Sequence, residues 1–180
     1  MLGGARSGKS ALAERLALAR QAEAGLAVVA IVTAEARDAE MQQRIRAHQA
    51  SRPAGWRTVE APLALADALR AQAAPGRLLL VDCLTLWLSN LLLLEPMAGD
   101  TSPWPLPARY LRERRQLLDT VATLPGELIL IGNEVGHGIV PIGALNRVFV
   151  DENGRLHQDL AARCDAVRFV MAGCALALKG

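Results

Sequence analysis

Short apolar runs alternate with longer stretches of helical periodicity along almost the whole chain. The apolar runs are rich in Val, Ile and Leu, which is typical of buried parallel strands, and they cover residues 26–34, 77–82, 127–132 and 166–173. Stretches with apolar residues three and four positions apart predict helices over residues 9–23, 38–50, 62–73, 84–94, 107–124 and 143–164. This alternation indicates an α/β fold with a mostly parallel sheet flanked by helices.

The length of the chain favours a single domain. A chain of 180 residues with 52% hydrophobic content is expected to fold as one globular domain over residues 1–180. Residues 95–107 hold four of the nine prolines and form the one evident irregular loop. The most apolar run, residues 78–94, is interrupted by Asp82, Ser89 and Asn90 and falls short of the roughly 18–20 apolar residues that a membrane span requires. We therefore expect no membrane span.

Charge and cysteine content narrow the function and the compartment. The formal net charge is +2, from 20 basic and 18 acidic residues, and only 3% of residues are aromatic. No basic stripe with stacking aromatics is present, so we expect no nucleic-acid partner. Cys83, Cys164 and Cys174 show no CxxC spacing, which indicates neither a disulfide framework nor a zinc site. Together with the lack of an apolar leader at the start, this favours the reducing cytoplasm.

The segment GGARSGKS opens the chain and has the complete G-x-x-x-x-G-K-[ST] spacing of a phosphate loop. Glycines let the backbone turn its N–H groups toward phosphate oxygens, and the following helix adds the positive end of its dipole. Lys9 is expected to reach the β and γ phosphates, and the Ser10 hydroxyl to bind Mg²⁺. The alternative is a glycine-rich turn that only caps a helix. The expected nucleotide-binding residues of this segment are Gly3, Gly4, Ala5, Arg6, Ser7, Gly8, Lys9 and Ser10.

An acidic residue ends the second buried run. RLLLVD finishes with Asp82, which is where a carboxylate at the C-terminal edge of the sheet would hold Mg²⁺ through water. Only Met1 and Leu2 precede the phosphate loop. Either the first strand is clipped or the true start lies upstream.

Five segments occur in an order that resembles one enzyme family over nearly the whole length. They are GGARSGKS (3–10), DAEMQQRIRAHQASRPAGWRTVEAP (38–62), VDCLTLWLSN (81–90), GNEVGHGIVP (132–141) and NGRLHQDLAARCDAVRFVMAG (153–173). The chain resembles the bifunctional adenosylcobinamide kinase/adenosylcobinamide-phosphate guanylyltransferase family. NEVGxGIVP is the most specific of these segments.

The resemblance implies a RecA-like P-loop NTPase fold, assembly as a homotrimer, and two reactions on one corrinoid substrate. Adenosylcobinamide would be phosphorylated on its aminopropanol hydroxyl by ATP or GTP. The new phosphate would then receive GMP from GTP to give adenosylcobinamide-GDP, through a guanylyl-histidine intermediate. These are late steps in the biosynthesis of adenosylcobalamin, vitamin B12.

The resemblance also assigns site residues. The family histidine of the R-I-x-x-H element corresponds to His48, and Ala47 stands where some relatives carry a second histidine. With Lys9, His48 is therefore an expected catalytic residue. Further positions are implied in guanine nucleotide binding: Thr33, Ala34, Glu35, Gln49, Ala50, Ser51, Arg52, Glu60 and Asp82.

Other polar residues receive weaker assignments. Asn133 and Glu134 directly follow a buried strand, so we expect them in the active cleft, with helix capping as the alternative for Asn133. His137 is expected to line the corrinoid or phosphate cleft without being catalytic. His157 has no support from the resemblance, and we expect a structural role.

Two alternative functions are compatible with the residues. The first is a P-loop kinase of another small molecule that lacks guanylyltransferase activity. The second is a RecA-like nucleotide-dependent binding module, against which the near-neutral charge argues. Retention of label from α-labelled GTP would separate the first alternative from the bifunctional enzyme.

Overall fold

A seven-stranded sheet forms the centre of the protein. The computed structural model describes residues 1–35, 43, 53, 55–94, 104–140 and 142–180. Within these residues the strand order is β3-β2-β4-β5-β1-β6-β7, and neighbouring strands are parallel except for the antiparallel pair β6 and β7. The strands are β1 (Leu2–Gly3), β2 (Ala27–Val32), β3 (Arg57–Glu60), β4 (Arg77–Asp82), β5 (Glu127–Asn133), β6 (Val167–Met171) and β7 (Cys174–Lys179).

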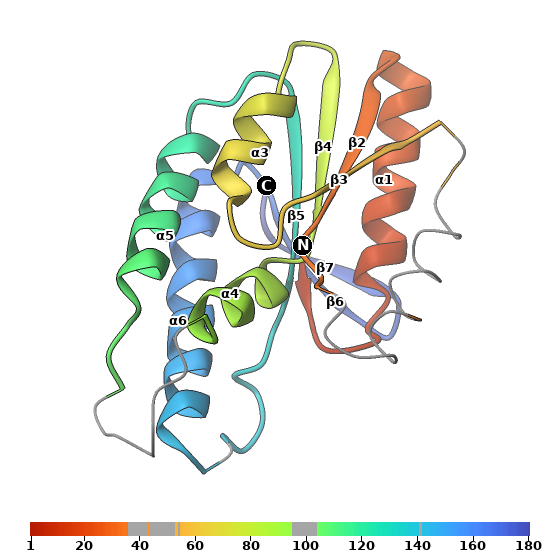
Figure 1. Ribbon diagram of the computed structural model, residues 1–180. Helices are drawn as coiled ribbons and strands as arrows, with labels where there is room; N and C mark the ends of the chain where they lie inside the picture. The colour runs from red at the N-terminus through yellow and green to blue at the C-terminus, as the bar shows by residue number, and fades with distance from the viewer. Residues whose placement is uncertain (36–42, 44–52, 54, 95–103, 141) are drawn as a thin grey trace.

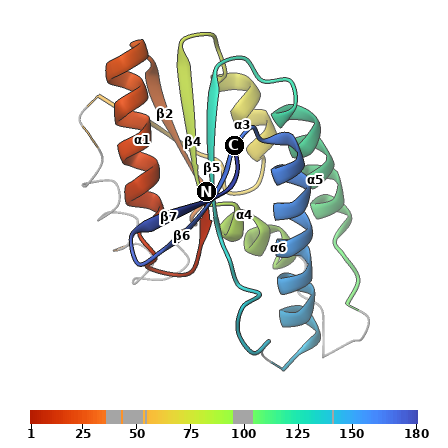
Figure 2. The same ribbon diagram turned by 180° about the vertical axis from the view of Figure 1, so that it is seen from behind.

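Helices cover both faces of this sheet (Figure 1). One face carries α1 (Lys9–Ala24), and the opposite face carries the other helices of the described residues, as the reverse view also shows (Figure 2). These helices are α3 (Leu65–Gln72), α4 (Leu84–Leu92), α5 (Ala108–Val121) and α6 (Ala144–Arg163). The α/β class and the mostly parallel sheet predicted from the sequence are confirmed.

Strand β4 connects two cores because its side chains alternate between the faces of the sheet. Leu78 points to the α1 side, where it packs in one cluster with Ala13 and Ala17. Leu79 belongs to the larger cluster on the other side, which includes the fully buried Trp87. Replacing Trp87 with Ala is expected to cost about 3–5 kcal/mol, since such a cavity cannot fully collapse. Strand β4 is therefore packed on both faces.

The edges of the sheet differ from the sequence expectation. Strands β3 and β7 were not predicted, because edge strands face solvent and lack a long apolar run; all six residues of β7 are exposed. The run at residues 166–173 was expected to be fully buried. In β6, Val167 and Val170 are buried, whereas Arg168 and Met171 are exposed. Hydrophobic runs thus located the interior of the sheet and missed its borders.

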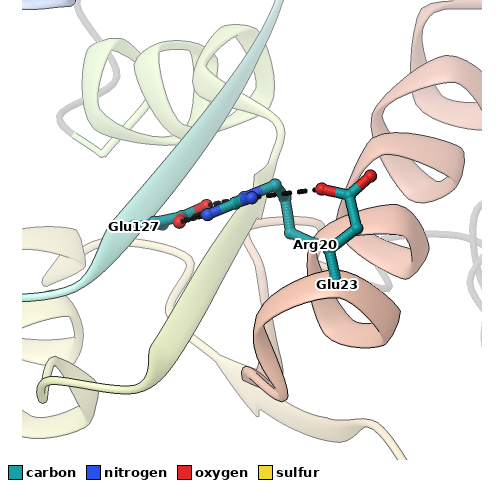
Figure 3. A network of polar contacts seen from close by, with 3 residues as sticks. All are labelled: Arg20, Glu23 and Glu127. Carbon is teal, nitrogen blue, oxygen red and sulfur yellow. Dashed lines mark hydrogen bonds and ion pairs between the residues drawn. The ribbon is translucent and has the colours of Figure 1, made fainter.

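An ion-pair network ties α1 to the amino end of β5 (Figure 3). Arg20 donates from Nε to Glu127 at 3.0 Å and from a terminal nitrogen to Glu23 at 3.2 Å. The hydrogen bond from Arg20 lowers the pKa of Glu127. Both partners of the Arg20–Glu127 pair are more than a third exposed, so the pair is expected to contribute about 1 kcal/mol or less. The network lies at the edge of the sheet opposite the phosphate loop.

Candidate active site

The phosphate loop joins β1 to α1 at the carboxyl edge of the sheet. Strand β1 has two residues, and it pairs with both β5 and β6. Helix α1 begins at Lys9, directly after Gly8 with a φ of 94°. The Lys9 side chain turns back across the loop, and its Nζ donates to the carbonyl of Gly4 at 3.1 Å. Lys9 is only 8% exposed, so its ammonium group faces the loop interior.

Close packing requires glycine at two loop positions. A Cβ at Gly3 would lie 2.4 Å from the carbonyl oxygen of Val170 in β6. A Cβ at Gly8 would lie 3.1 Å from the Cα of Gly173, which follows β6 in the turn to β7. The N–H of Gly173 donates to the carbonyl of Ser7 at 2.8 Å. The β6–β7 turn, which sequence reasoning missed, therefore supports the phosphate loop.

The carboxyl ends of β2 and β4 meet at Thr33 and Asp82. The Thr33 hydroxyl donates to the carbonyl of Cys83 at 2.6 Å and accepts the N–H of Cys83 at 3.0 Å, next to the cis Asp82–Cys83 peptide. The N–H of Thr33 donates to the backbone carbonyl of Asp82 at 3.2 Å, and the Thr33 carbonyl accepts from the side-chain amide of Asn90 at 2.8 Å. Thr33 is fully buried, and all of its polar groups are used within the chain. Its role in nucleotide binding stays a prediction.

The pKa of Cys83 reflects its burial and the charges near it. Burial, followed by the negative charge of Asp82, raises the pKa of the Cys83 thiol to about 11, while the positive charge of Lys9 acts in the opposite direction. Cys83 packs in the same buried cluster as Ala13 of α1, so the end of β4 lies beside the helix that follows the phosphate loop. Cys83 stays a neutral thiol at physiological pH and is unsuited to nucleophilic attack.

Asn133 and Glu134 lie at the same edge, as expected. Strand β5 lies between β1 and β4, and its last residue, Asn133, donates its N–H to the Thr85 hydroxyl at 2.7 Å. The N–H of Glu134 donates to the carbonyl of Gly3 in the phosphate loop at 3.0 Å. The end of β5 therefore binds both the loop and the segment that follows Asp82.

The two histidines in the described part of the site differ in environment. His137 is exposed, and its ring lies 5.9 Å from that of Phe169 in β6. His157 is buried on α6, and burial lowers its pKa despite the opposing effect of Glu134, whose carboxylate lies 3.9 Å from Nδ1. The contact of His157 with Glu134 was not foreseen, because no sequence spacing links the two positions.

The remaining expected site residues fall into two groups. Ala34 and Glu35 follow β2, and Glu60 ends β3 as an exposed residue. Five expected residues lie outside the described residues: His48, Gln49, Ala50, Ser51 and Arg52.

The oxygen donors at the site suit Mg²⁺. Within the part of the chain that the structure describes, no group of three or more His, Cys, Asp or Glu could hold a metal by itself. Mg²⁺ is usually bound by one or two carboxylates together with waters and substrate phosphates. A hydroxyl at Ser10 and a carboxylate at Asp82 fit that pattern.

The fold and the residues at this edge of the sheet define the class of protein as a P-loop NTPase. A phosphate loop with a buried lysine follows β1, and an acidic residue ends β4, which is the second strand along the sheet from β1. Residues 1–178 match the protein family described as cobinamide kinase / cobinamide phosphate guanyltransferase. The chain belongs to this family, and the two named activities agree with the enzyme expected from the sequence.

Curated relatives share this assignment over nearly their whole length. The chain is 56% identical over 180 residues to the bifunctional adenosylcobalamin biosynthesis protein CobP of Pseudomonas aeruginosa, covering 100% of this chain and 96% of the relative. It is 39% identical over 180 residues to the bifunctional adenosylcobalamin biosynthesis protein CobU of Salmonella typhimurium, covering 98% and 97%. The protein of that name from Escherichia coli is 36% identical over 182 residues, with the same coverage. Kinase and guanylyltransferase chemistry in cobalamin biosynthesis, with nucleotide and corrinoid substrates, follows from the family.

Among the described residues, no helix has the length and apolar content needed to cross a bilayer.

Proposed function

We propose that the chain phosphorylates adenosylcobinamide with ATP or GTP and then transfers GMP from GTP to the product, giving adenosylcobinamide-GDP. The observation that carries this proposal is the phosphate loop, in which the buried Lys9 ammonium lies against Gly4 at the edge where Asp82 ends β4. Such an arrangement can serve both steps, because each one displaces part of a nucleoside triphosphate.

In the kinase step the chain binds and orients the phosphates. The loop N–H groups and the start of α1 provide partial positive charge, and Lys9 adds a full charge beside the β and γ phosphates. Ser10 and Asp82 would hold Mg²⁺, which when bound neutralises charge on the phosphate oxygens. The aminopropanol oxygen forms a bond to the γ phosphorus, the bond to the departing nucleoside diphosphate breaks, and the hydroxyl proton is lost to solvent.

In the guanylyl step we assign the nucleophile to His48. A neutral imidazole nitrogen attacks the α phosphorus of GTP, a P–N bond forms, and pyrophosphate leaves. The phosphate of the corrinoid then attacks the same phosphorus and releases His48. We assign binding of the guanine nucleotide to Ala34, Glu35, Glu60 and residues 49–52. The buried and Glu134-facing position of His157 supports the choice of a different histidine.

Labelling with α-labelled GTP and Mg²⁺ tests this assignment. The protein should retain the α label after denaturation through an acid-labile, base-stable bond, and it should not retain the γ label. His48→Ala should abolish labelling and guanylyl transfer while it leaves substantial kinase activity. His137→Ala is the matched control and should still be labelled. Labelling of the His48→Ala variant would exclude His48 as the nucleophile.

We also propose that the chain assembles as a homotrimer in the cytoplasm. Several large apolar side chains lie exposed near the site and on the edge strand, which supports burial against another copy: Ile139, Ile142, Met171, Leu176 and Leu178. The three cysteines are unpaired, which agrees with a reducing compartment. Sedimentation equilibrium at micromolar concentration should give three times the chain mass, and a monomer mass would refute the assembly.

A further inference from the structure

Two contacts of Glu134, the residue that follows β5, link helix α6 to the phosphate loop. The N–H of Glu134 donates to the carbonyl of Gly3, the first glycine of the loop, at 3.0 Å. Strand β1 contributes only two residues to the sheet, so the hydrogen bonds of β1 with its neighbours hold the loop at few points. Whatever fixes the backbone of Glu134 therefore also fixes the start of the loop.

The Glu134 side chain folds back toward α6. One carboxylate oxygen accepts the N–H of Gly136 at 2.7 Å, and the other lies 3.9 Å from Nδ1 of His157. The exposed fractions of the two side chains are 22% for Glu134 and 6% for His157. One turn earlier on α6, Asn153 donates to the carbonyl of Asn133 at 3.0 Å, and its amide nitrogen lies 3.5 Å from the same ring nitrogen. Helix α6 thus faces the end of β5 with two polar side chains.

Strand β5 is shaped to admit the imidazole ring. A Cβ at Gly132 would lie 2.4 Å from Nε2 of His157, so a side chain there would displace the ring. Nε2 has no hydrogen-bond partner among the described residues, and a buried polar atom without a partner is costly. Leucine fills the neighbouring core positions Leu156 and Leu160 without that cost. What the ring offers in place of an apolar side chain is its pair of polar contacts at Nδ1, with the Asn153 amide nitrogen at 3.5 Å and the Glu134 carboxylate at 3.9 Å.

We propose that His157 and Glu134 are positioning residues for nucleotide binding. The ring of His157 lies against the Glu134 carboxylate and fixes its orientation. Glu134 in turn keeps its N–H bonded to the Gly3 carbonyl, which holds the phosphate loop in the conformation that binds phosphate. The inference rests on the proposed binding of GTP and ATP by the phosphate loop. Because the effect passes through the loop, it acts on both half-reactions alike, whereas His48 acts on one.

The affinity of the full chain for GTP carrying a fluorescent N-methylanthraniloyl group measures this positioning without any turnover. His157→Leu should weaken binding about tenfold, because the carboxylate loses its polar contact. His157→Gln, whose amide can donate to the carboxylate, should stay within about threefold of wild type. Leu160→Ala is the matched control: it removes apolar packing from the same helix and should lower the melting temperature but leave the affinity unchanged.

A double variant tests whether His157 acts through Glu134. Glu134→Gln alone should weaken binding several-fold, and adding His157→Leu to it should cause no further loss, because both changes break the same link. Wild-type affinity in His157→Leu, equal losses in the Leu and Gln variants, or independent losses in the double variant would each overturn the inference. If His157→Leu fails to fold, normal affinity in Glu134→Gln would overturn it by itself. Failure of the wild-type chain to bind the probe would instead refute the proposed function.

Discussion

Gly173 donates its backbone N–H to the carbonyl of Ser7 at 2.8 Å, so the turn between β6 and β7 is bonded directly to the phosphate loop. This bond joins residues at opposite ends of the sequence. It explains how a loop that follows a strand of two residues can be held in place. The support comes from the carboxyl-terminal strands as much as from β1.

Gly8→Ala should disrupt this contact. The φ of 94° is unfavourable for a residue with a Cβ by roughly 1–2 kcal/mol, and the methyl group would lie 3.1 Å from the Cα of Gly173. Isothermal titration should show GTP binding weakened by about tenfold or more. Gly154→Ala, in α6 with open space around the added methyl group, should bind GTP normally. Equal affinity in both variants would contradict the loop geometry.

Lys9→Ala should lower kinase and guanylyltransferase activity together. The substitution removes the buried cation beside Gly4, and its loss is expected to cost several kcal/mol of transition-state stabilisation in either reaction. Steady-state assays of both reactions measure the effect. Lys179→Ala is the control, since that lysine binds the carbonyls of Ala161 and Cys164 near the end of α6. Kinase turnover within a few-fold of wild type in Lys9→Ala would refute the assignment.

Asp82→Asn should shift the Mg²⁺ dependence of activity to higher concentration. The amide keeps the shape of the carboxylate at the end of β4 and removes one negative charge from the proposed metal site. Activity titrated against Mg²⁺ at saturating GTP gives the midpoint. Asp119→Asn, an exposed change on α5, should leave the midpoint in place. Superimposable curves for wild type and Asp82→Asn would remove Asp82 from the metal site.

His157 should make the free energy of unfolding depend on pH. Burial lowers its pKa in the folded state, so below about pH 6.5 the unfolded chain takes up a proton that the folded chain resists. Stability is therefore full above the unfolded pKa and falls as the pH drops below it. Urea unfolding at pH 7.5 and 5.5 should show a smaller difference for His157→Gln than for wild type. An unchanged difference would show that other groups carry the acid sensitivity.

The interior of the fold and the phosphate loop could be predicted from the sequence, because each depends on local patterns. Strand β4 is a continuous apolar run that ends in Asp82, and the spacing of Gly3, Gly8 and Lys9 specifies a phosphate loop by itself. Both features are visible without knowledge of the neighbouring strands.

The supports of the site could not be predicted, because they depend on contacts between distant segments. The β6–β7 turn meets Ser7 across most of the chain, and β7 carries no buried residue that would reveal it as a strand. Similarly, His157 meets Glu134 only because α6 packs against the end of β5. Thr33 matched a nucleotide-binding position by resemblance, and only the folded chain reveals that its hydroxyl is bound to Cys83.

Because β5 lies between β1 and β4, it sets the distance between charged groups at the ends of these two strands. Neighbouring strands lie about 4.8 Å apart, so β1 and β4 are separated by about 10 Å. At that separation and an effective dielectric constant of about 20, two like unit charges repel by about 1.7 kcal/mol, half of the value for adjacent strands. A carboxylate at the end of β4 can therefore share the edge with a bound phosphate at tolerable repulsion. The order of the strands therefore keeps the carboxylate at the end of β4 away from the anion that the phosphate loop is proposed to bind.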